Sequence, residues 1–269
     1  MDLGTIDDIV IPDDRSCLPP GRADTAVLAG GTWLFSEKQD HLRRLVDITA
    51  LGWPPLSEDE SGLDIAATCS IEQLSTVRID RWPATALFHE SATALLASFK
   101  VWNVATVGGN ICTALPAGAM ISLTTALDGV ALVWSSDGAD YRIPVRDLIT
   151  GPRRHALRRG DVVRSIRLPA RALSARTAFR KTALSPLGRS AAVVIGRVDA
   201  DGQFVLSVTA STVRPYVLRF PALPRPAELD DEIITRITDA DWYDDPHGAP
   251  DWRKHISRLS AREILEELS

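Results

Sequence analysis

The 269-residue sequence predicts an α+β fold. Short apolar runs of strand length end at glycine pairs or Asp-Gly pairs, and one longer segment carries apolar residues at helical spacing. The second half of the chain also shows the alternation of an antiparallel meander. With 45% hydrophobic residues, the chain is long enough to bury more than one core. We therefore expect two domains, residues 1–169 and 170–269.

The first third of the chain predicts strands separated by turns. In order, we expect a strand and tight turn at 25–34, a strand at 45–48, a turn-rich acidic loop at 53–62 and a strand at 63–69. The loop at 53–62 marks a boundary between two subdomains. Ser70 and Gln73 then have the spacing of a capping box, which predicts that a helix begins at Ser70.

The middle third predicts helices followed by a hairpin. Apolar residues at helical spacing predict a helix over 84–99, and a second helix is expected over 119–129. Asp137 and Gly138 mark the turn of a β-hairpin. A loop and a strand ending at Pro169 complete the first domain.

The last hundred residues predict the second domain. A connection at 169–176 leads into an antiparallel meander with a hairpin turn near Asp201 and Gly202. The Pro-rich stretch 221–229 links this meander to the closing helices, and 251–269 predicts a terminal amphipathic helix.

Composition excludes several classes of function. The net charge of −5, without long charge runs, disfavours nucleic-acid and anionic-membrane partners. No apolar run approaches the ~18 residues of a membrane span. Three isolated cysteines and an acidic N-terminus favour the cytoplasm. Neither a metal site nor a catalytic acid–base or nucleophilic group is expected, since the histidines do not cluster with carboxylates.

Two glycine pairs are the most informative feature of the sequence. Residues 29–34 read AGGTWL and residues 106–110 read TVGGN, and each pair follows an apolar run and precedes a small polar residue. Adjacent glycines let successive N–H groups converge on an anion without a Cβ in the way, so a diphosphate is the expected ligand. The spacing matches neither a P-loop nor a Rossmann turn, and ordinary tight turns remain an alternative.

The two motifs, in this order and spacing, resemble the FAD-binding medium subunit of the molybdenum hydroxylases, the xanthine dehydrogenase and carbon monoxide dehydrogenase group. The stretches LVDIT, GLDIAATCSIEQL and LITGPRRHALRRGDVVRSIRLP resemble the family in the same order. The resemblance implies a two-subdomain FAD-binding fold of the PCMH type, followed by a C-terminal α+β domain with an antiparallel sheet.

The resemblance also implies which residues bind FAD. The diphosphate and ribityl contacts would come from the first motif (Gly30, Gly31, Thr32, Trp33, Leu34) and from the second (Thr106, Val107, Gly108, Gly109, Asn110). Val163 would lie against the flavin, and Lys181 would lie near its ring system. For Lys181 a solvated surface lysine is the alternative.

Some positions depart from the family pattern. Ala119 stands where the family commonly has an FAD-contacting aspartate, Trp102 stands in place of a basic residue, and Ser185 in place of an arginine. These departures put the affinity for FAD in doubt.

The resemblance implies an FAD-dependent oxidoreductase component without catalytic residues of its own. A large molybdopterin-binding subunit and a small [2Fe–2S] subunit would be its partners in a heterotrimer, or a dimer of heterotrimers. Electrons would pass from the [2Fe–2S] subunit through FAD to NAD, oxygen or another acceptor. A stand-alone flavin oxidoreductase of the same fold, or a scaffold subunit that has lost FAD, are the alternatives.

Overall fold

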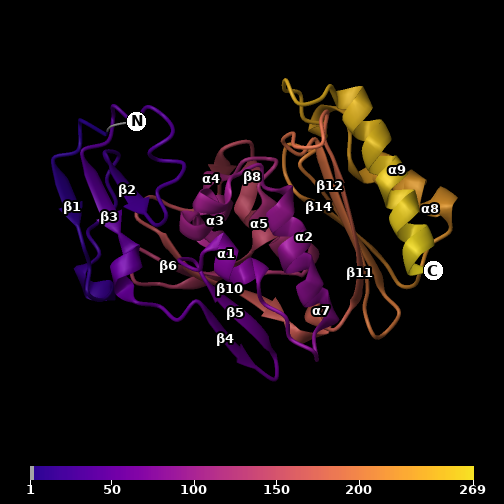
Figure 1. Cartoon of the computed structure of the whole chain (residues 1–269), viewed down its shortest axis with the longest axis horizontal. Helices are drawn as coiled ribbons and strands as arrows, with labels where there is room; N and C mark the ends of the chain where they lie inside the picture. The colour runs from indigo at the N-terminus through magenta and orange to yellow at the C-terminus, as the bar shows by residue number, and fades with distance from the viewer. Residues whose placement is uncertain (1–2) are drawn as a thin grey trace.

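The computed structural model describes residues 3–269 and shows three larger β-sheets side by side, besides a two-stranded hairpin (Figure 1). A small N-terminal sheet lies at one end, a five-stranded sheet with several helices in the middle, and a four-stranded sheet covered by two long helices at the other end. Among these residues, no helix is both long and apolar enough to cross a bilayer.

The N-terminal sheet has the order β1-β3-β2 and its strands are parallel. Its strands are β1 (Asp8–Val10), β2 (Thr25–Leu28) and β3 (Arg44–Asp47), with short 3-10 helices at Arg15–Cys17 and Ile48–Leu51. Val46 and Ile48 are buried against Val162, which belongs to the central sheet. This apolar contact fixes the small sheet against the rest of the molecule.

The central sheet is antiparallel, with the order β4-β5-β10-β6-β7. Its strands are β4 (Leu56–Asp59), β5 (Gly62–Ala66), β6 (Val130–Trp134), β7 (Tyr141–Pro144) and β10 (Val162–Pro169). The hairpin predicted at Asp137 and Gly138 is confirmed, with Gly138 at φ +84°. The acidic loop predicted at 53–62 is wrong in part, because its second half forms β4 and pairs with β5.

Several short helices cover this sheet. They are α1 (Ile71–Ser75), α2 (Ala86–Ala94), α3 (Phe99–Val104), α4 (Val107–Thr113), α5 (Ala119–Ala126), α6 (Val145–Leu148) and α7 (Ala170–Leu173), with a 3-10 turn at Pro83–Thr85 and a hairpin of β8 (Ile149–Gly151) and β9 (Arg154–His155). The capping box of Ser70 and Gln73 is confirmed. The single helix predicted over 84–99 is wrong: Leu95 is extended, and Phe99 begins a new helix with 72% of its surface exposed.

The C-terminal sheet is the predicted antiparallel meander, with its hairpin at Asp201 and Gly202. Its strands are β11 (Arg176–Thr182), β12 (Ala192–Val198), β13 (Phe204–Thr209) and β14 (Tyr216–Phe220), followed by α8 (Pro226–Arg236), a 3-10 turn at Asp239–Asp241 and α9 (Pro250–Leu268). Ile264 of α9 packs directly over Gly196 of β12. From α5, Ser122 Oγ is 2.7 Å from Thr209 Oγ1 of β13.

The α+β fold class is therefore confirmed. The main buried core includes Val193, Ile195 and Ala210 of the C-terminal sheet together with residues of the central sheet and α5. The boundary at 169/170 remains a prediction, since the apolar core continues across it.

Candidate functional site

The first glycine motif forms an open helical turn immediately after β2. Gly31 has φ +68°, a conformation that favours glycine, and its carbonyl accepts a hydrogen bond from the N–H of Phe35 at 2.9 Å. The N–H groups of Thr32, Trp33 and Leu34 donate to no acceptor in residues 3–269. These are the amides that a single helical turn leaves free at its N-terminus, where an anion can bind.

Gly30 brings the two motifs together. A Cβ on Gly30 would overlap the carbonyl oxygen of Val104 and lie 3.1 Å from the Cα of Ala105, directly before the second motif. Only glycine allows this approach of the two backbones. Segments more than 70 positions apart in sequence therefore share one site, as the family resemblance implies.

The second glycine motif is not a turn but the start of helix α4. Thr106 is its N-cap, and the Thr106 side chain accepts a hydrogen bond from the N–H of Gly109 at 3.1 Å. The N–H of Val107 donates to Cys69 O and that of Gly108 to Ala67 O, both at 2.9 Å. All three first-turn amides are therefore used inside the protein, and the contact of Gly108 and Gly109 with FAD stays a prediction.

Gly108 is required for packing. A Cβ there would lie 2.5 Å from Ala67 Cβ and 2.8 Å from Ala67 O, whereas one on Gly109 would meet only Thr106 Oγ1 at 2.9 Å. Gly108 thus lets α4 lie directly on the segment after β5, and Gly109 faces a more open side.

Asn110 connects α4 to the next helix. Its side-chain oxygen accepts a hydrogen bond from the N–H of Met120 at 3.0 Å, in the first turn of α5. Within residues 3–269, the Asn110 amide nitrogen has no such partner, so this group can still donate to a ligand.

An open cleft of about 460 Å³ lies between the two motifs. Neutral hydroxyl and amide side chains dominate its wall, and Glu72 is its one charged residue in the described part of the chain. The lining residues are Ala29, Gly30, Thr49, Thr68, Ser70, Glu72, Gln73, Asn103, Val104 and Thr106. Hydroxyls and amides suit the ribityl, ribose and diphosphate groups of a dinucleotide, which are rich in donors and acceptors.

Most of this wall could not be recognised from the sequence. Thr49 and Thr68 follow strands, and Asn103 belongs to α3, so topology alone brings them to one cleft. The Ser70 and Gln73 capping box was the one available signal, and it identifies a helix start and not a binding site.

Of the residues predicted to contact FAD, only Gly30 and Thr106 are among the described residues that line this cleft. The two predicted contacts outside the glycine motifs lie elsewhere in the fold. Val163 lies on β10 opposite Val133 and is buried in the main core. Lys181 lies half-buried on β11, opposite Val193 of the C-terminal sheet. Their contact with a flavin stays a prediction.

The departure at Ala119 has a clear structural setting. Ala119 is the first residue of α5, is only 1% exposed, and belongs to the main core. Nearby, burial raises the pKa of the Cys112 thiol on α4 to about 12, which keeps that thiol protonated. Neither residue offers a charge to a ligand.

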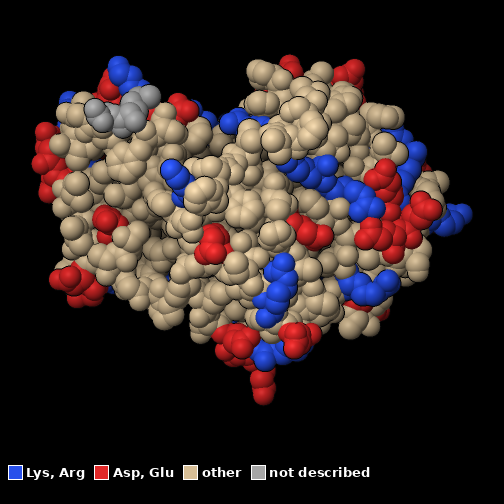
Figure 2. Space-filling model, in the orientation of Figure 1, with Lys and Arg blue, Asp and Glu red and all other residues tan. Residues whose placement is uncertain are grey.

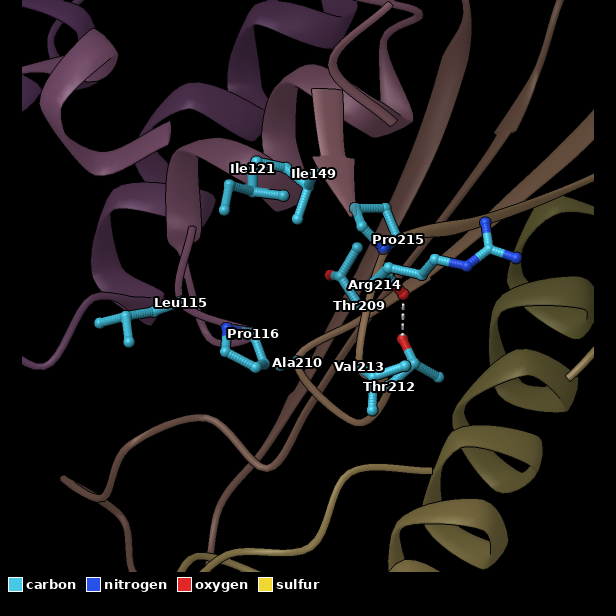
Figure 3. Close-up of a pocket in the computed structure, with 10 residues that line it drawn as sticks. All are labelled: Leu115, Pro116, Ile121, Ile149, Thr209, Ala210, Thr212, Val213, Arg214 and Pro215. Carbon is cyan, nitrogen blue, oxygen red and sulfur yellow. Dashed lines mark hydrogen bonds between the residues drawn. The ribbon is translucent and has the colours of Figure 1, made fainter. Parts of the chain in front are cut away.

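A second hollow lies where the helices over the central sheet meet the C-terminal sheet (Figure 3). Pro116 and Ile121 line it on one side and Ala210 and Val213 on the other, and Arg214 points away from it. It has essentially no free internal volume, so we interpret it as a packing seam.

Comparison with known structures shows the same fold throughout the chain. CO dehydrogenase from Oligotropha carboxidovorans superposes with a TM-score of 0.84 at 19% identity, covering 100% of this chain and 99% of that one. Quinoline 2-oxidoreductase from Pseudomonas putida 86 gives 0.79 at 16% identity, covering 100% and 98%. CO dehydrogenase from Hydrogenophaga pseudoflava gives 0.77 at 18% identity, covering 98% and 97%.

Comparison of the sequence identifies the family more specifically than comparison of the fold does. A search of curated proteins gives no significant match. Residues 18–171, more than half of the chain, match the family described as the FAD binding domain in molybdopterin dehydrogenase. The matched range contains both glycine motifs and every residue that lines the cleft. The resemblance inferred from these motifs is confirmed, and the chain belongs to the FAD-binding domain family of the molybdopterin dehydrogenases.

Proposed function

We propose that the chain holds FAD in the cleft between its two glycine motifs and transfers electrons within a molybdenum hydroxylase complex. The observation that carries this proposal is the 460 Å³ cleft, which is lined by Gly30 and lies next in sequence to the three free amides, within the matched family range. A hydrogen bond to a charged group contributes about 1.5–3 kcal/mol, so the amides of Thr32, Trp33 and Leu34 together suffice for tight binding. Bound FAD would supply two-electron redox chemistry.

The residues of the chain have separate tasks in this proposal. The first motif provides donors to the diphosphate. The hydroxyls of Thr49, Thr68 and Ser70 bind the sugar-like portions of the cofactor. Asn110 donates its free amide N–H groups while its oxygen holds α5 in place. The chain itself contributes binding and orientation, and we assign it no catalytic acid or base.

The partners follow from the same proposal. A [2Fe–2S] subunit would deliver electrons, a molybdopterin subunit would oxidise the substrate, and NAD, oxygen or another acceptor would receive the electrons. Solved relatives include complexes that act on CO and quinoline, by their names. Figure 2 shows acidic and basic side chains interspersed over this face of the molecule. Such a mixed surface suits contact with another protein better than with a polyanion.

The experiment is a titration of the purified full chain with FAD, followed by flavin fluorescence. We expect saturable binding, and about tenfold weaker binding in Thr32→Pro, which deletes one free amide at a position where a helical turn tolerates proline. The matched control is Thr93→Ala, at an exposed site on α2 away from the cleft lining. Absence of FAD binding in the wild-type chain would contradict the proposal.

A scaffold subunit without FAD is the second candidate. It is favoured by the buried alanine at position 119 and by a cleft wall that includes neither lysine nor arginine in the described residues. A protein that stays colourless at high FAD but co-purifies with iron- and molybdenum-containing partners would support this candidate. A yellow protein that is active alone would instead support a stand-alone flavin oxidoreductase.

A further inference from the structure

Arg153 occupies a backbone position that normally belongs to glycine. The sequence Gly151-Pro152-Arg153-Arg154 forms the turn of the β8–β9 hairpin, and Arg153 has φ +55°. A turn with proline at its second position and a left-handed third residue favours glycine or asparagine there. Left-handed backbone in a non-glycine residue is strained, and such strain often marks a functional position.

The backbone around Arg153 is held in place by the C-terminal end of helix α4. The N–H of Arg153 donates to the carbonyl of Ala114 at 2.7 Å. Ala114 is itself left-handed, at φ +51°, and terminates α4. The hairpin tip is therefore fixed relative to the helix that begins with Gly108 and Gly109, and the direction of the Arg153 side chain follows from this attachment.

The side chain reaches the first motif. Its guanidinium carbon lies 5.4 Å from the centroid of the Trp33 ring, within the range of a cation–π contact. Within residues 3–269 no carboxylate or other acceptor binds it, and it is exposed. Arg197 and Arg253, by contrast, are buried and each is paired with an aspartate. The Arg153 cation is available to a ligand.

We propose that Arg153 and the free amides after Gly31 form one anion site, and that its ligand is the diphosphate of FAD. The inference deepens the proposed function and rests on it. Two independent kinds of donor meet at Trp33: backbone N–H groups without acceptors and a cation without a counterion. Within residues 3–269, the cleft wall adds only neutral groups and the carboxylate of Glu72. Arg153 is thus the cation that balances the charge of the diphosphate.

The backbone strain separates a binding role from a structural one. If the role of Arg153 is to supply a cation to the ligand, replacing it with glycine relieves the backbone strain and at the same time removes a ligand contact. Arg153→Gly should therefore raise the melting temperature of the cofactor-free chain by about 2 °C and weaken FAD binding about tenfold. If Arg153 had only a structural role, Arg153→Gly would not weaken FAD binding while raising the melting temperature.

The test uses the full chain without cofactor, titrated with FAD, with ADP as competitor, and with riboflavin. ADP carries the diphosphate without a flavin, and riboflavin carries the flavin without a phosphate. We expect Arg153→Gly to weaken the binding of FAD and ADP by similar factors and to leave the binding of riboflavin unchanged. Arg153→Lys should bind FAD and ADP more tightly than Arg153→Gly, although less tightly than the wild type. Arg236→Ala, an exposed cation on α8, is the matched control and should bind all three as the wild type does.

Two results overturn the proposal while leaving the proposed function intact: wild-type affinity for FAD and ADP in Arg153→Gly, or a loss confined to riboflavin, which would place Arg153 at the ring. A wild-type chain that binds neither FAD nor ADP overturns the proposed function and this proposal with it. Stronger salt dependence of FAD binding in the wild type than in Arg153→Gly would add support.

Discussion

In the turn at residues 29–34, the amides of Thr32, Trp33 and Leu34 have no acceptor within residues 3–269, whereas in the segment 106–110 every amide from Val107 to Asn110 donates to the protein. Both segments contain a glycine pair, and in both a glycine permits a close approach of backbones. In the first segment, that approach leaves N–H donors free for a ligand. In the second segment, it lets helix α4 pack on the chain around Ala67.

The second motif is also tied more deeply into the molecule. Asn110 holds the N-terminus of α5, and α5 packs on the C-terminal sheet through Ser122 and Thr209. The loop after α5 carries Asp128, which pairs with the buried Arg197. A change at this motif should therefore affect stability first, and a change at the first motif should affect cofactor affinity first.

The largest effect is expected at the far end of α5. Asp128→Asn should lower the free energy of unfolding by about 3 kcal/mol, because it removes a charge partner of Arg197, which is 1% exposed. Burial raises the pKa of Asp128, but Arg197 and Arg219 outweigh this and hold the pKa below its ordinary value. The ion pair thus contributes stability above the unfolded pKa of about 4, and this contribution is lost as the pH falls further.

Urea unfolding at pH 7 and at pH 3 measures both parts of this prediction. The wild type should lose more stability between the two values than Asp128→Asn does. Equal losses in the two proteins would show that the pair does not stabilise the junction between α5 and the C-terminal sheet.

The next effect distinguishes two adjacent glycines. Gly108→Ala should lower stability by about 1–3 kcal/mol, because its Cβ would overlap Ala67. Gly109→Ala should lower the free energy of unfolding by less than about 1 kcal/mol, since only Thr106 Oγ1 lies close and the helix position favours alanine. Thermal and urea melts of both variants check this order. The reverse order would mean that Gly109 is the packing residue.

A smaller effect is expected at Asn110. Asn110→Ala leaves the N–H of Met120 without its acceptor and should cost about 1–2 kcal/mol. Asn110→Asp keeps an acceptor at the N-terminus of α5 and should stay within about 0.5 kcal/mol of the wild type. Because aspartate lacks the donating amide, its FAD affinity should still fall. Wild-type affinity in Asn110→Asp would exclude Asn110 as a cofactor contact.

Local patterns in the sequence predicted the strands, hairpins and terminal helix well. The turn at Gly138, the meander and the capping box at Ser70 depend on neighbouring residues, so they could be read directly. The break between α2 and α3 could not, because the apolar residue Phe99 fits a helical period although its side chain is exposed. Hydrophobic periodicity cannot distinguish a buried apolar residue from an exposed one.

For the site, the glycine motifs identified the family, but not how each motif works. The N–H groups of Val107 and Gly108 donate to the carbonyls of Cys69 and Ala67, which only the folded chain brings near. Likewise, Arg153 lies against Trp33 while its N–H is bonded to the carbonyl of Ala114 at the end of α4. Both features arise from tertiary contacts between distant segments.

Hydrogen–deuterium exchange with and without FAD tests the central claim most directly. The account predicts that FAD protects the amides of residues 32–34, whose donors are free, and changes residues 107–110 little because those donors are already bonded. Protection concentrated at 107–110, with none at 32–34, would contradict it.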